Sequence, residues 1–212
     1  MNKEHFSVTK LDKTFGATVR DVKLSKVTEG EVKELYSLWL RHSLLIFPDQ
    51  HLSTIEQIEF AKLFGVMEFD LAPISNVRSD GSIRDPVDDD VVKSLRGNME
   101  WHHDSTYMPI QAKGSVFTAH QVPEEGGETG WADMTAAYKA LDPKMKDKIE
   151  GLSAYHSYVY SQAKYKHKPQ EESEFSGYGF DVDPHPFRPL VKTHPETGRK
   201  SLLIGRHAYG IP

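Results

Sequence analysis

The chain has 212 residues, of which 38% are hydrophobic and 27% are charged, and its formal net charge is -5. These values are typical of a single soluble globular domain, and the acidic balance argues against a protein dedicated to nucleic-acid binding. The lack of cysteine excludes disulfides, thiolate zinc sites, iron–sulfur clusters and a cysteine nucleophile.

No stretch of the sequence has the pattern of a membrane span or a targeting signal. The longest apolar run, residues 44–47, is far shorter than a bilayer requires. The N-terminal residues lack the apolar centre of a signal peptide. We therefore expect a cytoplasmic protein without a membrane partner.

Three short strands are expected among the first fifty residues. Residues 6–11 and 17–22 have strand-like patterns, and Gly16 between them marks a turn. Residues 43–47 form an apolar run that Pro48 ends, which is typical of a buried strand.

Two capping boxes predict the starts of two helices. Each has a hydroxyl residue followed three positions later by a glutamate, Thr28 with Glu31 and Ser53 with Glu56. Apolar side chains follow at helical spacing, and Gly65 suits the end of the second helix. We interpret both apolar stripes as core that packs on a sheet.

Residues 76–97 are polar and contain turn-forming pairs at residues 80–81 and 85–86. We expect a long mobile loop, because segments of this kind often form lids or binding loops. The acidic run at residues 88–90 is interpreted as a solvated surface, since nothing would hold three adjacent carboxylates around one ion.

After residue 98 the sequence changes to strand-like segments with two short helices. One helix is expected from Asp133 or Met134 to Leu141, and the next from Pro143, with Asp142 as its N-cap. Six strands are expected, at residues 99–107, 115–122, 128–131, 153–160, 188–193 and 201–204. Many short strands with few helices favour a mainly β fold of the α+β class, a β-sandwich or jelly roll decorated by helices.

The sharpest chemical feature is the pair His102 and Asp104. Side chains two apart on a strand point to the same face, so this spacing presents an imidazole and a carboxylate to one metal ion. With a second histidine they would form the facial triad of non-haem Fe(II) enzymes. A structural His–Asp hydrogen bond is the alternative, and the spacing alone does not separate the two. His103 would face the other side and is expected to pack rather than to bind metal.

Two segments resemble one enzyme family. Residues 98–107, which contain Trp-His-His-Asp, and residues 122–134, which contain Gly-Gly-Glu-Thr, are similar to Fe(II)/α-ketoglutarate-dependent dioxygenases. The family is that of the taurine and 2,4-dichlorophenoxyacetate dioxygenases (TauD/TfdA-like). Residues 45–47, 64–65, 190–195 and 198–204 match it in the same order, so the resemblance covers nearly the whole chain.

The resemblance implies a fold, a reaction and several residue roles. The fold would be a double-stranded β-helix, the jelly roll of clavaminate-synthase-like enzymes. His102 and Asp104 would hold Fe(II), Thr129 would bind a carboxylate of the cosubstrate α-ketoglutarate, and Asn98 falls at a substrate-side position. The reaction would use dioxygen to hydroxylate a small organic acid or amine, with succinate and carbon dioxide as products.

Asp70 departs from the pattern of the taurine enzymes. They carry at this position a histidine that helps to bind the sulfonate, and a carboxylate would repel a sulfonate or carboxylate unless a cation lay between them. We therefore expect a substrate other than taurine, with a phenoxyalkanoate or another small acid or amine left open. The alternative is that Asp70 is an exposed loop residue without a role in binding.

The C-terminal part of the family pattern has no match in this chain. The distal histidine ligand and the arginine that pairs with α-ketoglutarate cannot be assigned, so we expect one dioxygenase-like domain, residues 1–212, without the family's last strands. Such a chain would cover its exposed sheet edges as a homo-oligomer, or be marginally stable. For His207, near the end, a substrate-pocket or structural role is favoured over that of a replacement ligand.

Two other kinds of function stay open at the level of sequence. An inactive jelly-roll fragment, or a protein that binds a small molecule without catalysis, fits the unmatched ligands. A zinc hydrolase that uses the same His–Asp pair is less favoured, because zinc usually takes three protein ligands. Such an enzyme would also not need the Gly-Gly-Glu-Thr match.

Overall fold

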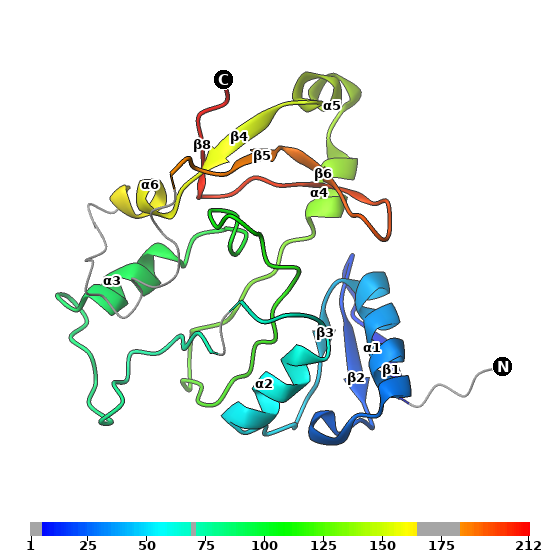
Figure 1. The fold of residues 1–212 in the computed structure, drawn as a ribbon, viewed down its shortest axis with the longest axis vertical. Helices are drawn as coiled ribbons and strands as arrows, with labels where there is room; N and C mark the ends of the chain where they lie inside the picture. Colours follow the sequence, from blue (N-terminus) through cyan, green and yellow to red (C-terminus); the bar gives the residue numbers. More distant parts are fainter. Residues whose placement is uncertain (1–5, 69–70, 165–182) are drawn as a thin grey trace. The chain divides into compact units, whose positions relative to one another are not determined.

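The computed structural model describes residues 6–68, 71–164 and 183–212 (Figure 1). The chain divides into two compact units. Unit 1 consists of Met1–Ala72, Gly114–Ala136 and Pro195–Gly198, and unit 2 of Pro73–Lys113, Ala137–His194 and Arg199–Pro212. The single dioxygenase-like domain over residues 1–212 stays a prediction.

A three-stranded sheet organises unit 1. It contains β1 (Ser7–Lys10), β2 (Ala17–Arg20) and β3 (Leu45–Ile46), in the order β1-β2-β3. β1 and β2 are antiparallel, whereas β2 and β3 are parallel. Gly16 makes the turn into β2 with φ of 94°. Residues other than glycine adopt this φ only with strain. The three predicted strands are confirmed, each somewhat shorter than expected.

Both predicted helices of unit 1 begin at their capping boxes. α1 (Glu29–His42) follows Thr28, and α2 (Thr54–Lys62) follows Ser53. In each box the hydroxyl accepts from the backbone N–H of the glutamate, whose carboxylate accepts from the backbone N–H of the cap. A short 3-10 helix, η1 (Leu24–Lys26), precedes α1.

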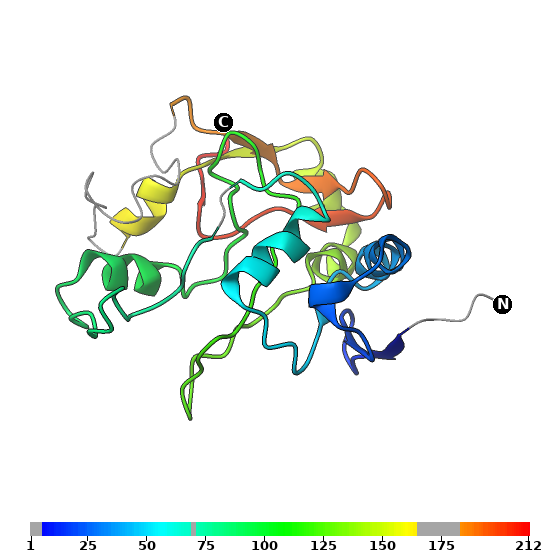
Figure 2. The ribbon, with the colours of Figure 1, turned by 60° about the horizontal axis from the view of Figure 1, so that its bottom comes forward.

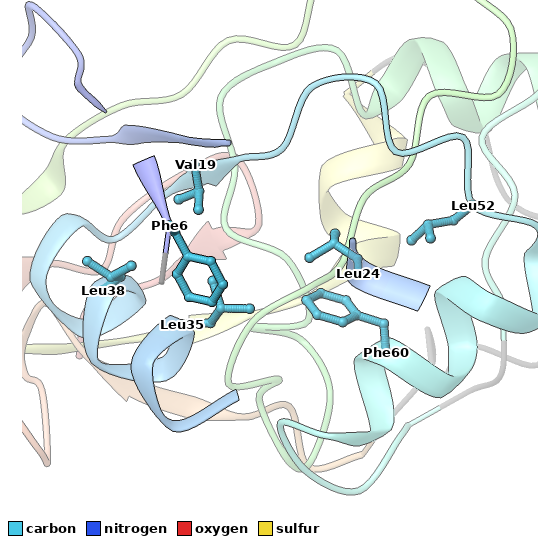
Figure 3. Packing of buried hydrophobic residues seen from close by; sticks show 7 residues of the cluster. All are labelled: Phe6, Val19, Leu24, Leu35, Leu38, Leu52 and Phe60. Atoms are coloured by element: carbon cyan, nitrogen blue, oxygen red, sulfur yellow. The ribbon is translucent and has the colours of Figure 1, made fainter. Parts of the chain in front are cut away.

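The apolar stripes of these helices contribute Leu35, Leu38 and Phe60 to the core of unit 1 (Figure 3). The prediction that both stripes are core is wrong for Ile55 and Leu63, which are 73% and 49% exposed. Seven side chains, each at most 6% exposed, make up the cluster: Phe6, Val19, Leu24, Leu35, Leu38, Leu52 and Phe60. Aromatic rings extend it, since Phe60 packs edge-on against Phe47 and Phe64. Later residues also return to this unit, because Val116 packs against the same cluster.

Unit 2 contains two small antiparallel sheets. β4 (Ser153–His156) lies between β5 (Phe187–Pro189) and β8 (Ala208–Tyr209), and β6 (Val191–Thr193) pairs with β7 (Lys200–Leu202). Figure 2 shows the β6–β7 hairpin in orange and red. In β4, Ala154 and His156 are buried whereas Tyr155 is 37% exposed, so one face of this sheet is interior. Arg188 lies opposite Ala154 and shares that face.

Four helices complete the described fold. They are α3 (Asp90–Gly97), α4 (Met134–Ala140), α5 (Pro143–Ile149) and α6 (Tyr158–Ala163). α4 and α5 are at their predicted places, and Asp142 caps α5 with Pro143 in the first turn. None of the helices in the described ranges is long and apolar enough to cross a membrane.

The prediction of one long loop over residues 76–97 is wrong for its last third. α3 begins at Asp90, because the Asp89 carboxylate accepts hydrogen bonds from the backbone N–H groups of Val91 and Val92. The acidic run is also not wholly solvated, because the Asp89 side chain is only 9% exposed and pairs with Arg78 at 2.6 Å and Arg84 at 3.5 Å. The sequence analysis missed this N-cap.

Three predicted strands are absent from the described residues. Residues 99–107, 115–122 and 128–131 contain turns, bends and irregular backbone. The predicted strand 153–160 ends at His156, since the Ser157 hydroxyl caps α6 by accepting from the backbone N–H of Tyr160 at 3.1 Å. A strand-like pattern forms a strand only where a partner strand supplies the hydrogen bonds, and in the described ranges no strand pairs with these segments.

Candidate metal centre

The predicted pair of His102 and Asp104 lies together in unit 2, although not on a strand. The His102 Nε2 atom is 3.1 Å from the Asp104 Oδ1 atom. The His102 Nδ1 atom is 2.7 Å from the carbonyl oxygen of Glu100. Because a carbonyl only accepts, Nδ1 carries a proton, and Nε2 is the atom that faces the carboxylate.

The two side chains shift each other's titration in opposite directions. The hydrogen bond to Asp104 raises the pKa of the His102 imidazole, although burial works against it. The same hydrogen bond lowers the pKa of the Asp104 carboxyl. The pair therefore favours a proton, or another cation, between a nitrogen and an oxygen donor.

Residues from the loop between β7 and β8, distant in the sequence, hold the backbone before the pair. The backbone N–H of Arg206 donates to the Trp101 carbonyl at 3.1 Å. A Cβ atom added at Gly205 would lie 3.0 Å from the His102 Cα atom and 3.2 Å from the Trp101 carbonyl oxygen. Glycine thus allows the two segments to approach closely beside the predicted metal ligands.

The backbone after the pair forms a tight turn. Ser105 has φ of 52°, and its carbonyl accepts from the backbone N–H of Met108 at 3.0 Å. The Arg188 guanidinium donates from Nε to the Thr106 carbonyl at 2.9 Å, and from Nη2 to the Met108 carbonyl. Thr106 and Met108 are 1% and 6% exposed, so this turn is packed into unit 2.

His207 is a buried neighbour of the pair. Its ring centroid is 5.4 Å from that of His102, and its side chain is 2% exposed. The His207 Nδ1 atom is 2.8 Å from the Ser161 hydroxyl. Burial, together with the charges of His102 and Arg206, lowers the pKa of His207 to about 3, so the ring is neutral near pH 7.

The donor set fits two positions of an iron site. Bonds of about 2.1 Å at right angles place two donor atoms about 3 Å apart, which matches the separation between the His102 and Asp104 donors. Within residues 6–68, 71–164 and 183–212, no group of three His, Asp or Glu side chains is arranged to hold a metal ion. The structure thus brings together the two ligands that the sequence predicted.

The other predicted site residues have different positions. Asn98 ends α3, where its backbone N–H donates to the Ser94 carbonyl at 3.1 Å. Thr129 is exposed, has irregular backbone and belongs to unit 1. Asp70 lies outside the described residues. His103 is half-buried, and burial is the main cause that lowers its pKa. Its placement by strand alternation was wrong, because residues 99–107 are not a strand.

Sequence reasoning missed Ser161, Arg188, Gly205 and Arg206, which support the site from other elements. Each is separated by more than 50 residues from the motif, so no local spacing could connect them to it. The one local sign of these contacts was Gly205 within an apolar C-terminal stretch. A glycine in such a stretch often indicates that another backbone segment approaches closely.

Comparison with known proteins decides the family. A model of the family described as "Taurine catabolism dioxygenase TauD, TfdA family" matches residues 7–212. The chain belongs to the TauD/TfdA family. It is 56% identical over 209 residues to the (S)-phenoxypropionate/alpha-ketoglutarate-dioxygenase of Sphingobium herbicidovorans, with 98% of this chain and 73% of the relative covered.

More distant TauD/TfdA enzymes agree. The alpha-ketoglutarate-dependent 2,4-dichlorophenoxyacetate dioxygenase of Cupriavidus pinatubonensis is 35% identical over 210 residues, covering 92% of this chain and 71% of that enzyme. The solved structure of AAD-2 in complex with Mn(II) and N-oxalylglycine is 33% identical with a TM-score of 0.82, over 97% of this chain and 74% of that one. The expected α+β jelly-roll fold of the TauD/TfdA dioxygenases is thereby confirmed.

Proposed function

We propose that this TauD/TfdA-family chain works as a non-haem Fe(II) and α-ketoglutarate-dependent dioxygenase on an aryloxyalkanoic acid. The observation that carries the proposal is the His102–Asp104 donor pair, in a chain 56% identical to a (S)-phenoxypropionate dioxygenase. The reaction consumes α-ketoglutarate, dioxygen and a substrate C–H bond. It yields succinate, carbon dioxide and a substrate C–OH group.

The residues of this chain bind, orient and exclude water. When bound, Fe(II) supplies the oxidation of the substrate by dioxygen. His102 and Asp104 would hold the metal, and the Glu100 carbonyl fixes the His102 ring so that Nε2 faces the Asp104 carboxylate. Thr129 holds a carboxylate of α-ketoglutarate, and Asn98 touches the substrate.

The choice of an aryloxy acid rests on similarity and on charge. The relatives at 56% and 35% identity are named for phenoxypropionate and 2,4-dichlorophenoxyacetate. Asp70 in place of the sulfonate-binding histidine argues against taurine, since like charges repel. A cytoplasmic location and self-association are further proposals from the sequence.

The test is anaerobic addition of Fe(II) and α-ketoglutarate, followed through the visible charge-transfer band of the chelated keto acid. We expect a band in the parent chain and in His51→Asn, an exposed control. His102→Ala and Asp104→Ala should lose it. Added dioxygen and (S)-2-phenoxypropionate should then release succinate. A band that persists in His102→Ala would rule out this pair as the iron site.

A second candidate is a protein that binds the small acid without oxidising it. Among the described residues, His102 and Asp104 form no group of three with another His, Asp or Glu that could hold a metal ion, which favours this candidate. The same experiment separates the two. Binding of α-ketoglutarate without succinate formation, at saturating Fe(II) and dioxygen, would support the binding protein.

A further inference from the structure

One arginine from a distant strand holds the turn that follows the candidate metal ligands. Arg188 of β5 lies 84 positions after Asp104 in the sequence. Its Nε–H donates to the Thr106 carbonyl at 2.9 Å, and its Nη2 group donates to the carbonyls of Met108 and, at 3.4 Å, Pro109. One rigid guanidinium thus fixes the distance between the Thr106 and Met108 carbonyls.

The charge of Arg188 is directed at the backbone. Among the described residues, its hydrogen-bond acceptors are carbonyl oxygens and not a carboxylate. The side chain shares the buried face of β4 and β5 with Ala154, and burial lowers its pKa. A desolvated cation makes strong hydrogen bonds to carbonyls, so the turn is held firmly.

Asp104 depends on this turn for its orientation. The Asp104 side chain is 75% exposed, whereas that of His102 is 24% exposed, so apart from the hydrogen bond with His102 the carboxylate depends mainly on its own backbone for its orientation. The next residue, Ser105, has φ of 52°, a conformation that a serine keeps only when its surroundings hold it. Besides Arg188, the backbone N–H of Ala112 anchors the turn by donating to the Ser105 hydroxyl at 2.8 Å.

Lys192 supports the far end of the same segment. It lies two residues beyond Leu190 and four beyond Arg188 along the neighbouring strands, and its Nζ donates to the Gln111 side chain at 2.8 Å. Its single ammonium contacts a side chain and not the backbone turn. Arg188 is therefore the residue whose loss frees Thr106 and Met108.

We propose that Arg188 is a positioning residue for the metal centre, which fixes the Ser105–Met108 turn and thereby holds the Asp104 carboxylate beside His102. The inference rests on the proposed function in that His102 and Asp104 are taken as the metal ligands. Arg188 itself acts only through the backbone carbonyls that it binds.

Mn(II) affinity tests the proposal without turnover. In Arg188→Gln the dissociation constant for Mn(II) should rise by about tenfold or more, the usual effect of losing a group that orients metal ligands. Arg188→Lys should fall between Arg188→Gln and the parent, because it keeps the charge but not the fork. Arg96→Gln, at an exposed arginine of α3, is the matched control and should bind like the parent.

Two further measurements separate positioning from general destabilisation. In metal-free Arg188→Gln, the backbone amides of Met108 and Ala112 should exchange hydrogen faster, while those of α1 stay unchanged. Methylguanidinium added to Arg188→Gly should restore Mn(II) binding. An Arg188→Lys chain that binds as tightly as the parent, or a rescue that fails, would overturn the proposal.

His102→Ala shows which claim fails if the result is negative. If His102→Ala binds Mn(II) as the parent does, the proposed metal site is wrong. If His102→Ala loses affinity and Arg188→Gln keeps it, only the role of Arg188 is wrong.

Discussion

At His207, the hydrogen bonds of one serine define which ring nitrogen carries the proton. The Ser161 hydroxyl oxygen is 2.7 Å from the Tyr158 carbonyl and 2.8 Å from His207 Nδ1. A hydroxyl has one proton, and a carbonyl only accepts, so the proton of Ser161 goes to Tyr158. His207 Nδ1 must then donate to Ser161, which leaves Nε2 as an acceptor on the ring that neighbours His102.

We expect the His207 ring of the metal-free protein to be the Nδ1–H tautomer, which nitrogen-15 NMR of the imidazole would show. Ser161→Ala should shift the ring toward the Nε2–H form and cost about 1–3 kcal/mol in the free energy of unfolding, because Nδ1–H loses its buried acceptor. Ser37→Ala, at an exposed serine of α1, is the control. An Nε2–H ring in the parent would contradict the assignment.

His156 should make the stability of the protein depend on pH. The ring is 1% exposed, and its nitrogens have no hydrogen-bond partner among the described residues. Burial, then the charges of Arg188 and His103, lowers its pKa from 6.5 to about 4. The unfolded chain therefore binds a proton near pH 6.5 that the folded chain takes up only near pH 4.

The free energy of unfolding should thus be unaffected by His156 above pH 6.5 and fall as the pH is lowered toward 4. The slope that this group adds to the free energy of unfolding approaches about 1.4 kcal/mol per pH unit, which corresponds to the uptake of one proton on unfolding. Urea denaturation of the metal-free protein at several pH values measures it. His156→Phe should reduce the slope by the amount that corresponds to one proton. His51→Asn, at an exposed histidine, should leave the slope unchanged.

At the scale of elements, predictions from local sequence signals were correct, whereas predictions of strands that need a distant partner were often wrong. The capping boxes at Thr28 and Ser53 were predicted because the groups that form them lie within four residues. The strand expected over residues 99–107 is absent, since Ser105 has a left-handed conformation and no strand of the described part of the chain pairs with this segment. His102 and Asp104 nevertheless meet, because a tight turn brings residues two apart together as a strand would.

Two glycines of different surroundings give an element-scale prediction. Gly205→Ala should lower the free energy of unfolding by about 1–3 kcal/mol, because its Cβ would press on the His102 backbone at 3.0 Å. Gly30→Ala, in the first turn of α1 with 4.0 Å to its nearest neighbour, should raise it by up to about 1 kcal/mol. Chemical denaturation measures both, and equal effects would contradict the close approach at Gly205.

At the scale of the whole molecule, both units are built from separated stretches of chain. Unit 1 takes residues from three stretches and unit 2 from three, so the chain passes between the units five times. Each stretch of one unit therefore continues into a stretch of the other. When either unit unfolds, the ends of the stretches that form the other unit are no longer held in place. This connectivity, together with the single domain expected from the sequence, favours one cooperative transition.

Leu35→Ala tests that cooperativity. Leu35 is fully buried in the core of unit 1, so the substitution should cost about 2–5 kcal/mol. If the molecule unfolds as one, hydrogen exchange in α6 of unit 2 should reveal the same loss as exchange in α1. A loss confined to α1 would instead show that unit 2 unfolds independently.

The family could be predicted from motifs spread along nearly the whole sequence. The helix caps and the proximity of His102 and Asp104 could be predicted as well, because they depend on residues within a few positions of one another. Tertiary structure alone decided which residues hold that pair. Arg188 of β5, with Gly205 and Arg206 of the loop before β8, reaches it from far along the sequence. Hydrogen bonds between such segments form only once packing has brought them together.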